Sequence, residues 1–374
     1  MVNNKSGIVN GLGVLGIADL ITALLGGIFW LIIATLIEPE EYGKITYLLS
    51  IVGIAFSICL IGIRETIVVY IAKKNPITPT IFFITGLSGL IGFIALSGIF
   101  SRFDLSFLLL GFIINELSLG YFLGLKLYQS YSKFVVIQKI SSFVLGIAFV
   151  LIFGYEGLIA ALALSYVHFA IIYFKVIRLE KINFSLLLTS KFFIENYIMN
   201  VSSSFRGHLD KIILLPIVGF AIIGNYALAL QVFAMMMVFP RLVFKYILPE
   251  DIDHNNNKKL KLFTILFGII MALLGYFLSP IVIPIIFPKF LEVVGIIQII
   301  SFAAIPASIN QIQTSKLLSM EKSRSILISR LLGLATMISL IIILTPSMEE
   351  LGISIAFVGS SVILCIALFI FNNK

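Results

Sequence analysis

The sequence predicts an all-α integral membrane protein with about twelve transmembrane helices in two six-helix halves. The first observation is composition: hydrophobic residues make up 60% of the 374 residues and charged residues only 12%, and the mean hydropathy is +1.14. A soluble domain is usually about a quarter charged. This chain therefore cannot cover itself with a polar surface. The other two observations are apolar runs of membrane-spanning length and a one-sided distribution of basic loops.

The apolar runs have the length that a membrane helix requires, about 20 residues. Barrel strands would alternate apolar and polar residues, and runs such as "SFLLLGFII" do not alternate. Helices also satisfy their own backbone hydrogen bonds within lipid. The predicted helices span 12–36, 45–71, 79–100, 105–125, 135–153, 158–178, 194–218, 221–247, 261–283, 290–317, 325–345 and 352–371.

Local features justify several of these boundaries. The first apolar stretch, 8–37, is too long for the core of a signal peptide and has no small-residue cleavage site, so we expect a retained first helix. The polar run "PEDIDHNNNKKLK" (249–261) predicts a turn between the eighth and ninth helices. Pro306 is expected to loosen the tenth helix, because proline has no backbone N–H to donate.

The loops predict the orientation of the chain. With the N-terminus in the cytoplasm, the inside loops hold most of the basic residues and the outside loops hold only Lys44, Arg102 and Lys289. Cytoplasmic loops of membrane proteins are enriched in Lys and Arg, so we expect both termini to lie in the cytoplasm. We expect the membrane to be the plasma membrane. The outside loops carry these acids instead: Glu38, Glu40, Glu41, Asp104, Glu156, Glu292, Glu349 and Glu350.

Weak internal similarity divides the chain into two lobes, 1–180 and 181–374. "EEYGKITYLLSI" follows the first helix and "AIIGNYALALQV" follows the seventh; aligning Gly43 with Gly224 gives a shift of 181 residues. "KFVVIQK" (133–139) and "RSILISR" (324–330) share a basic–basic spacing at a similar shift. Because six helices are an even number, the two halves would have the same orientation.

Charged residues in the middle of a span are costly, so each is a candidate functional residue. Arg64 and Glu65 are adjacent, and we expect either an interfacial pair or a substrate contact there. Asp19, Glu116 and Asp210 are candidates for binding a coupling ion or for pairing with a base, as is Glu65. The candidates for substrate binding are Arg64, Asn196, Asn200, Ser203, Arg206 and Lys211.

The seventh helix is the most informative. Asn196, Asn200, Ser203, Arg206 and Asp210 recur at three- and four-residue steps, which predicts one continuous polar stripe. Arg206 and Asp210 are four residues apart and could pair. Arg206 lies about 22 Å from the start of this helix, near the middle of the membrane. Such a stripe must face other helices or a wet cavity.

Other classes of function have little support. There is no Gly-rich phosphate loop, no His-Glu-x-x-His and no Cys/His cluster, so we expect no enzyme, metal or cofactor. The net charge of +8 forms no basic face, which argues against nucleic acid. Two distant cysteines indicate neither a disulfide nor a metal site. A membrane-embedded glycan polymerase or transferase would need acids at the outer surface, such as Glu40, Glu41, Glu349 or Glu350.

Two stretches resemble a known family. "LIEPEEYGKITYLLSI" (36–51) and "FRGHLDKIILLPIVGFAIIGNYALAL" (205–230) are similar to the regions around the first and seventh helices of Wzx-type polysaccharide flippases in the MATE-like (MOP) superfamily. The resemblance implies a MATE-like fold and a cationic cavity between two lobes. The chain is shorter than is usual for that family. It also lacks the two additional helices typical of lipid II flippases.

The resemblance implies a flippase that carries isoprenoid-diphosphate-linked oligosaccharide to the outer leaflet by alternating access. Arg206 and Lys211 would then meet the anionic head group, since guanidinium is a planar, multi-donor binder. The expected partners are the glycan lipid, membrane lipids and glycan-assembly proteins. The alternative is a MATE-like cation-coupled antiporter for small organic molecules, whose cavity should be more acidic and aromatic.

Overall fold

The fold is given by a computed structural model that describes residues 2–61, 64–73, 77–178, 182, 191–252 and 257–372. Within these ranges, some helical side chains lie outside the description: 2–12, 65, 72, 191–196, 198–200, 202–206 and 249. All regular structure in the described part of the chain is helical. The prediction of an all-α protein is therefore confirmed.

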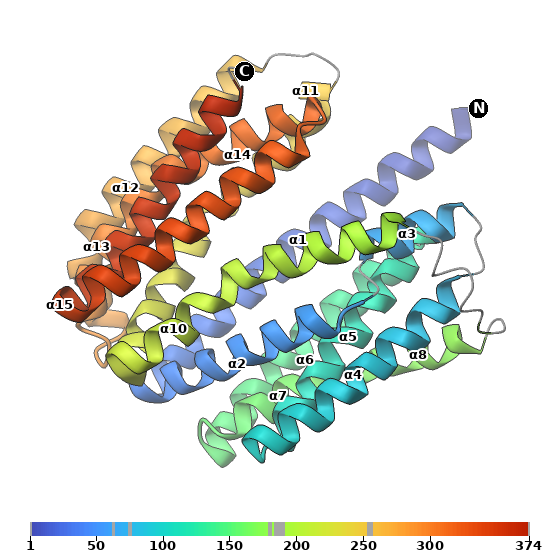
Figure 1. Ribbon diagram of the computed structural model, residues 1–374, viewed down its shortest axis with the longest axis horizontal. Helices are drawn as coiled ribbons and strands as arrows, with labels where there is room; N and C mark the ends of the chain where they lie inside the picture. Colours follow the sequence, from blue (N-terminus) through green and yellow to red (C-terminus); the bar gives the residue numbers. More distant parts are fainter. Residues whose placement is uncertain are drawn as a thin grey trace. The chain divides into compact units, whose positions relative to one another are not determined.

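Eight α-helices and one 3-10 turn precede the polar segment near residue 180 (Figure 1). They are α1 (Val2–Leu36), α2 (Pro39–Cys59), α3 (Arg64–Ala72), α4 (Thr78–Phe100), α5 (Phe103–Gly124), α6 (Tyr128–Phe153), α7 (Gly157–Ser165), η1 (Val167–Phe169) and α8 (Ala170–Ile177). The second part of the chain forms α10 (Lys191–Met236), α11 (Val238–Ile252), α12 (Lys258–Ile286), α13 (Val293–Ile300), η2 (Ser301–Ala303), α14 (Ala304–Ser319) and α15 (Ser323–Asn372).

Two of these helices, α10 and α15, each contain a turn. Gly219 in α10 has φ 77° and ψ 179°, a backbone conformation open to glycine because it has no Cβ. The Tyr226 hydroxyl lies 3.2 Å from Asp210, although 16 residues of straight helix would separate them by about 24 Å. In α15 the turn is at Glu349 (φ 45°, ψ −117°). The parts of α10 and α15 before and after these turns count separately, and each of the twelve predicted spans therefore falls on helical residues.

Four of the predicted spans are broken inside, and one of these is the eighth, where α10 ends at Met236 and α11 begins at Val238. The second predicted helix is broken, because α2 ends at Cys59 and α3 begins at Arg64. The sixth is interrupted by η1. In the tenth, the irregular turn is η2, just before Pro306. Proline lacks the N–H that would bond the carbonyl of Phe302, so the disturbance falls four residues N-terminal of the ring.

The chain forms two compact units whose boundaries cut through α1, α2 and α10. Unit 1 holds 1–29 and 47–209, and unit 2 holds 30–46 and 210–374. In unit 1, α5 packs against α3, α4 and α7. In unit 2, α14 packs against α11, α12 and α15. The division of the sequence into lobes at 180 and 181 stays a prediction.

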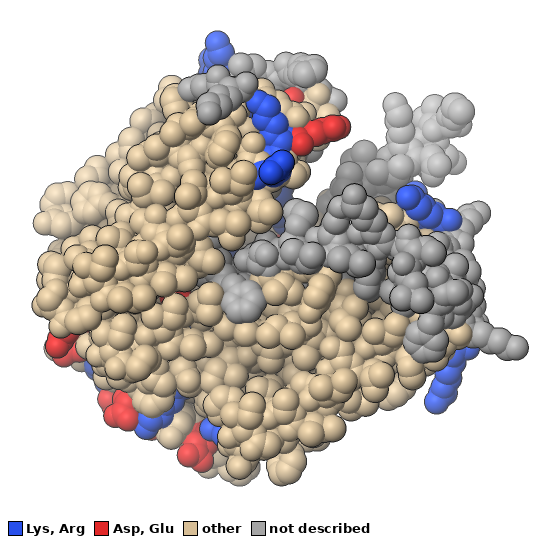
Figure 2. Space-filling view, in the orientation of Figure 1, with Lys and Arg blue, Asp and Glu red and all other residues tan. Residues whose placement is uncertain are grey.

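Ten helices in the described part of the chain are long and apolar enough to cross a membrane. Large apolar side chains are exposed along many of them, including Ile94, Ile152, Ile171 and Ile285 at 70%, 70%, 69% and 76%. On the face drawn in Figure 2, described Lys, Arg, Asp and Glu residues gather toward its edges. The chain is a multi-pass membrane protein.

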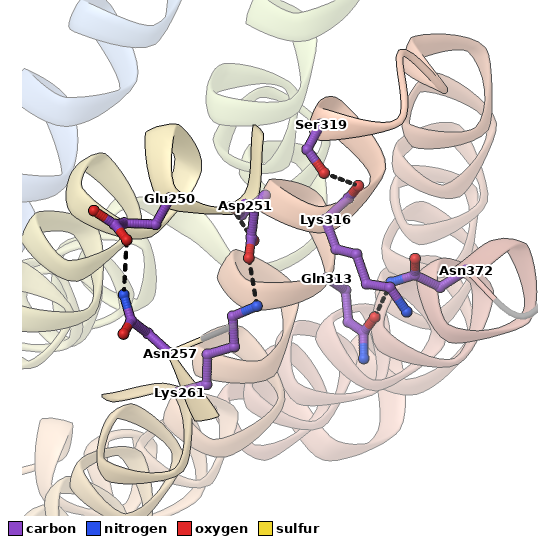
Figure 3. Close-up of polar contacts among 9 residues, drawn as sticks. Glu250, Asp251, Asn257, Lys261, Gln313, Lys316, Ser319 and Asn372 are labelled. Carbon is purple, nitrogen blue, oxygen red and sulfur yellow. Dashed lines mark hydrogen bonds and ion pairs between the residues drawn. The ribbon is translucent and has the colours of Figure 1, made fainter. Parts of the chain in front are cut away.

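The described residues on either side of the predicted polar turn at 249–261 make polar contacts within unit 2 (Figure 3). Asp251 of α11 pairs with Lys261 of α12 at 2.5 Å and accepts a hydrogen bond of 2.7 Å from Ser315 of α14. Asn257 donates to Glu250 at 3.3 Å. Three helices are thus tied together by one buried carboxylate, which fixes this end of the unit.

Candidate functional site

In unit 1, close packing of α3 on α5 positions the first candidate group. Gly120 of α5 lies against the backbone of Arg64: a Cβ at this glycine would be 3.2 Å from the Arg64 Cα. Gly124, one turn further along, packs in the same way on Ile71. These glycines bring the start of α3 within reach of Glu116, one turn before Gly120.

The polar cluster of unit 1 consists of Asp19, Arg64, Glu116 and Tyr131, from α1, α3, α5 and α6. The Arg64 guanidinium donates to Glu116 at 2.5 Å, and the two side chains are 28% and 21% exposed. Arg64 also hydrogen-bonds the hydroxyl of Tyr131, and Asp19 lies within electrostatic range of that hydroxyl. The structure therefore brings together three residues that the sequence predicted separately.

The ion pair described in this cluster joins residues far apart in the sequence. Arg64 pairs with Glu116, 52 residues away, and the expected Arg64–Glu65 pair stays a prediction. Neighbouring residues on a helix point about 100° apart, so adjacency disfavours a shared contact. The side chain of Glu65 lies outside the described residues. With two carboxylates and one guanidinium, the cluster carries more acid than base.

In unit 2, the candidate residues Asp210 and Lys211 meet Tyr226 across the turn of α10. Asp210 is only 5% exposed and accepts a hydrogen bond of 3.2 Å from the Tyr226 hydroxyl. The Lys211 ammonium lies 3.4 Å from both carboxylate oxygens and 5.9 Å from the centre of the Tyr226 ring. Gly219 makes this contact possible, because it reverses the chain between the two arms. Sequence reasoning did not single out Tyr226.

The remaining residues of the predicted stripe are only partly described. Their backbone belongs to α10, but their side chains lie outside the described residues, so the predicted Arg206–Asp210 pair stays a prediction. These residues are Asn196, Asn200, Ser203 and Arg206. The neighbouring His208 packs against Gly53 of α2 in unit 1, where a Cβ on that glycine would overlap the imidazole.

Acidic residues gather near the turn of α15 in unit 2. The amide of Asn225, 1% exposed, donates to Glu292 at 2.9 Å and to Glu350 at 3.0 Å. Nearby in sequence, Lys289 pairs with Glu38 at 2.9 Å. Glu350 is therefore held by a buried amide.

Arg102 stands apart from these groups, between α4 and α5. It pairs with Asp104 at 2.6 Å. The hydrogen bonds that Arg102 donates to Asp104 raise the pKa of the guanidinium, and burial works in the opposite direction. This basic residue on a predicted outer loop is thus neutralised by a local acid.

The two glycines that define the predicted repeat contact each other within unit 2. A Cβ on Gly43 would overlap the carbonyl of Phe220, and a Cβ on Gly224 would overlap the carbonyl of Pro39. Residues 39 and 220 differ by 181, as do 43 and 224. Contact of this reciprocal kind is expected around a two-fold axis. The alignment of Gly43 with Gly224 therefore has a structural counterpart.

Known structures share this architecture. The lipid II flippase MurJ in an inward closed conformation matches with a TM-score of 0.78 and 14% identity, over 96% of this chain and 87% of that one. An inward-facing multidrug resistance MATE transporter of the MOP superfamily matches with a TM-score of 0.73 and 12% identity, over 94% and 93%. The Vibrio cholerae MATE transporter VcmN matches at 0.58 and 13% identity, over 100% and 98%.

The chain has the MATE-like fold. No protein-family model matches it, and no curated protein matches it in sequence. At 12–14% identity the structural matches establish the fold alone. The MATE-like fold that the resemblance implied is thus confirmed, and the Wzx-type family itself stays a prediction.

Proposed function

We propose that this chain is a flippase that moves isoprenoid-diphosphate-linked oligosaccharide from the cytoplasmic to the outer leaflet by alternating access. The observation that carries the proposal is a set of paired, largely buried ionisable groups among the helices of each unit, in a MATE-like fold. Arg64 and Glu116 lie in unit 1, and Asp210 and Lys211 lie in unit 2. Intramembrane charge of this kind marks substrate and ion pathways.

The reciprocal contact of Gly43 and Gly224 supports the transport mechanism. Transporters built from repeats commonly move one repeat against the other around a fixed site. Gly43 and Gly224 occupy corresponding positions of the two predicted repeats and touch within unit 2. We propose that the plasma membrane is the site of action, with both termini cytoplasmic, and that glycan-assembly proteins supply the substrate.

Vesicle transport tests this proposal. The purified protein is reconstituted with a lipid-linked oligosaccharide, and a lectin outside the vesicles reports arrival of the glycan. We expect flipping by the wild type and strong loss in Arg206→Ala and Asp210→Ala, because each removes one charge of the α10 stripe. Unchanged flipping in both variants, or none in the wild type, contradicts the proposal. Lys133→Ala, at an exposed position outside the stripe, serves as the control.

A cation-coupled antiporter for small organic molecules is the second candidate. The excess of acid in the unit 1 cluster favours it, because Asp19 and Glu116 outnumber the single guanidinium of Arg64. It predicts efflux of an organic cation driven by a sodium or proton gradient, and loss of efflux in Asp19→Asn. Gradient-driven efflux without glycan-lipid movement would select this function over the flippase.

A further inference from the structure

We infer that Lys139 of α6 binds the anionic head of the transported lipid, through a phosphate-type oxygen. This inference rests on the proposed function and names one residue of its binding site. In the sequence, Lys139 is one member of the repeated basic spacing "KFVVIQK" (133–139). Its place in the structure gives it a different role.

Lys139 lies inside α6, away from both of its ends. It stands 11 residues after the start of α6 at Tyr128 and 14 before the end at Phe153. These separations correspond to about 16 Å and about 21 Å of helix. Its ammonium lies beside Gly26 of α1.

Neighbouring contacts place the ammonium in the seam between α1 and α6. Toward the start of α6, Ser132 donates to the carbonyl of Val14 at 3.3 Å. Toward the end of α6, the rings of Phe29 and Phe143 lie 6.0 Å apart. Between these layers, the Lys139 Nζ is 3.8 Å from the position that a Cβ on Gly26 would occupy. Gly26 thus leaves room beside the ammonium.

Two other described cations already have a carboxylate partner. Arg64 pairs with Glu116, and Lys211 pairs with Asp210. Among the residues that the structure describes, Lys139 has neither an ion pair nor a hydrogen-bond acceptor for its ammonium. A positive charge among apolar helices carries a free-energy cost, which an anionic oxygen would offset.

The anion would lie about two helical turns beyond the unit 1 cluster. Asp19 and Gly26 are seven residues apart on α1, so they share a face about 10 Å apart along the axis. On α6, Tyr131 precedes Lys139 by eight residues, a similar rise. An anion at Lys139 is therefore separated from the repelling carboxylates of Asp19 and Glu116.

Binding measurements in nanodiscs of neutral phosphatidylcholine test the inference. The probes are a polyprenyl diphosphate, the corresponding polyprenyl alcohol and sodium pyrophosphate. We expect the diphosphate lipid to bind the wild type, and Lys139→Met to weaken that binding about 10-fold to 100-fold, as loss of a charge-assisted hydrogen bond implies. Lys139→Arg should retain most of the affinity. Lys133→Met, on the same helix at an exposed position, should retain all of it.

The probes also identify the source of the anion. If sodium pyrophosphate also binds in a way that depends on Lys139, the site recognises the phosphate group alone. If the diphosphate lipid binds and pyrophosphate does not, the site recognises the lipid head together with its tail. Equal affinity of Lys139→Met and wild type for every probe overturns the inference. If the wild type flips the glycan lipid and the binding affinity does not depend on Lys139, only this inference is contradicted. If the wild type flips no glycan lipid, the proposed function is contradicted.

Discussion

Single side chains within the helices determine where charge is available in this protein. The Arg64–Glu116 pair and the Asp210–Lys211–Tyr226 group each compensate their own charge. A carboxylate in this setting is stabilised by its partner and is costly once the partner is lost. These groups therefore contribute to stability whether or not they contact substrate.

Removing one member of the unit 1 pair tests this statement. We expect Glu116→Gln to lower the free energy of unfolding by about 2 kcal/mol, because Arg64 then loses its compensating charge. The Arg64→Gln/Glu116→Gln double variant should recover part of that loss. Thermal unfolding in detergent measures both. Glu40→Gln is the control, since its pair with Lys44 is exposed and worth less than about 1 kcal/mol. Fully additive losses would contradict the coupling.

The hydroxyl of Tyr226 can be tested separately. Tyr226→Phe keeps the buried ring and removes the donor to Asp210, so we expect a loss of about 1–2 kcal/mol in unfolding free energy. Tyr276→Phe is a matched control, because Tyr276 is 40% exposed. A Tyr226→Phe protein as stable as the wild type would show that Lys211 alone satisfies the carboxylate.

Some of these residue contacts could not be predicted from the sequence. Depth along an apolar run identified Arg64, Glu116 and Asp210 as candidates. It could not identify their partners, because an ion pair between α3 and α5 depends on helix packing over 52 residues. Tyr226 belongs to the "GNYALAL" motif, but its hydrogen bond to Asp210 requires the turn at Gly219. Lys139 was visible only as a lysine inside the predicted span 135–153.

At the scale of helices, the apolar runs predict the fold well because lipid permits few alternatives. All twelve predicted spans fall on helical residues. The breaks inside helices were harder: only Pro306 gave a signal near η2, and the separation of α2 from α3 has no proline or polar run. The repeat aligned Gly43 with Gly224 but did not predict that these two glycines touch.

The glycine contact yields a prediction about helix packing. We expect Gly43→Ala and Gly224→Ala each to lower the unfolding free energy by about 1–3 kcal/mol, because the added methyl group overlaps a backbone carbonyl. Gly295→Ala is the control within unit 2, since the space around that position is open. Thermal unfolding and the yield of folded protein report the effect. Two alanine variants as stable as the control would contradict the close contact.

At the scale of the whole molecule, loop charge predicts an orientation that the fold alone does not give. Single cysteines in a background of Cys59→Ser and Cys365→Ser test it. We expect Glu156→Cys to react with a membrane-impermeant maleimide on intact cells. Lys126→Cys, which is equally exposed, should react only after lysis. The reverse pattern would show that the basic loops face outward.

The central claim is that the molecule moves an anionic lipid-linked glycan across the bilayer. The most direct measurement compares initial flipping rates in proteoliposomes for an isoprenoid-diphosphate-linked oligosaccharide and for the same glycan on a neutral lipid, alongside gradient-driven uptake of an organic cation. We predict rapid flipping of the diphosphate-linked glycan, slow flipping of the neutral one and no cation transport. Equal movement of both glycans, or transport of the cation alone, would contradict the account.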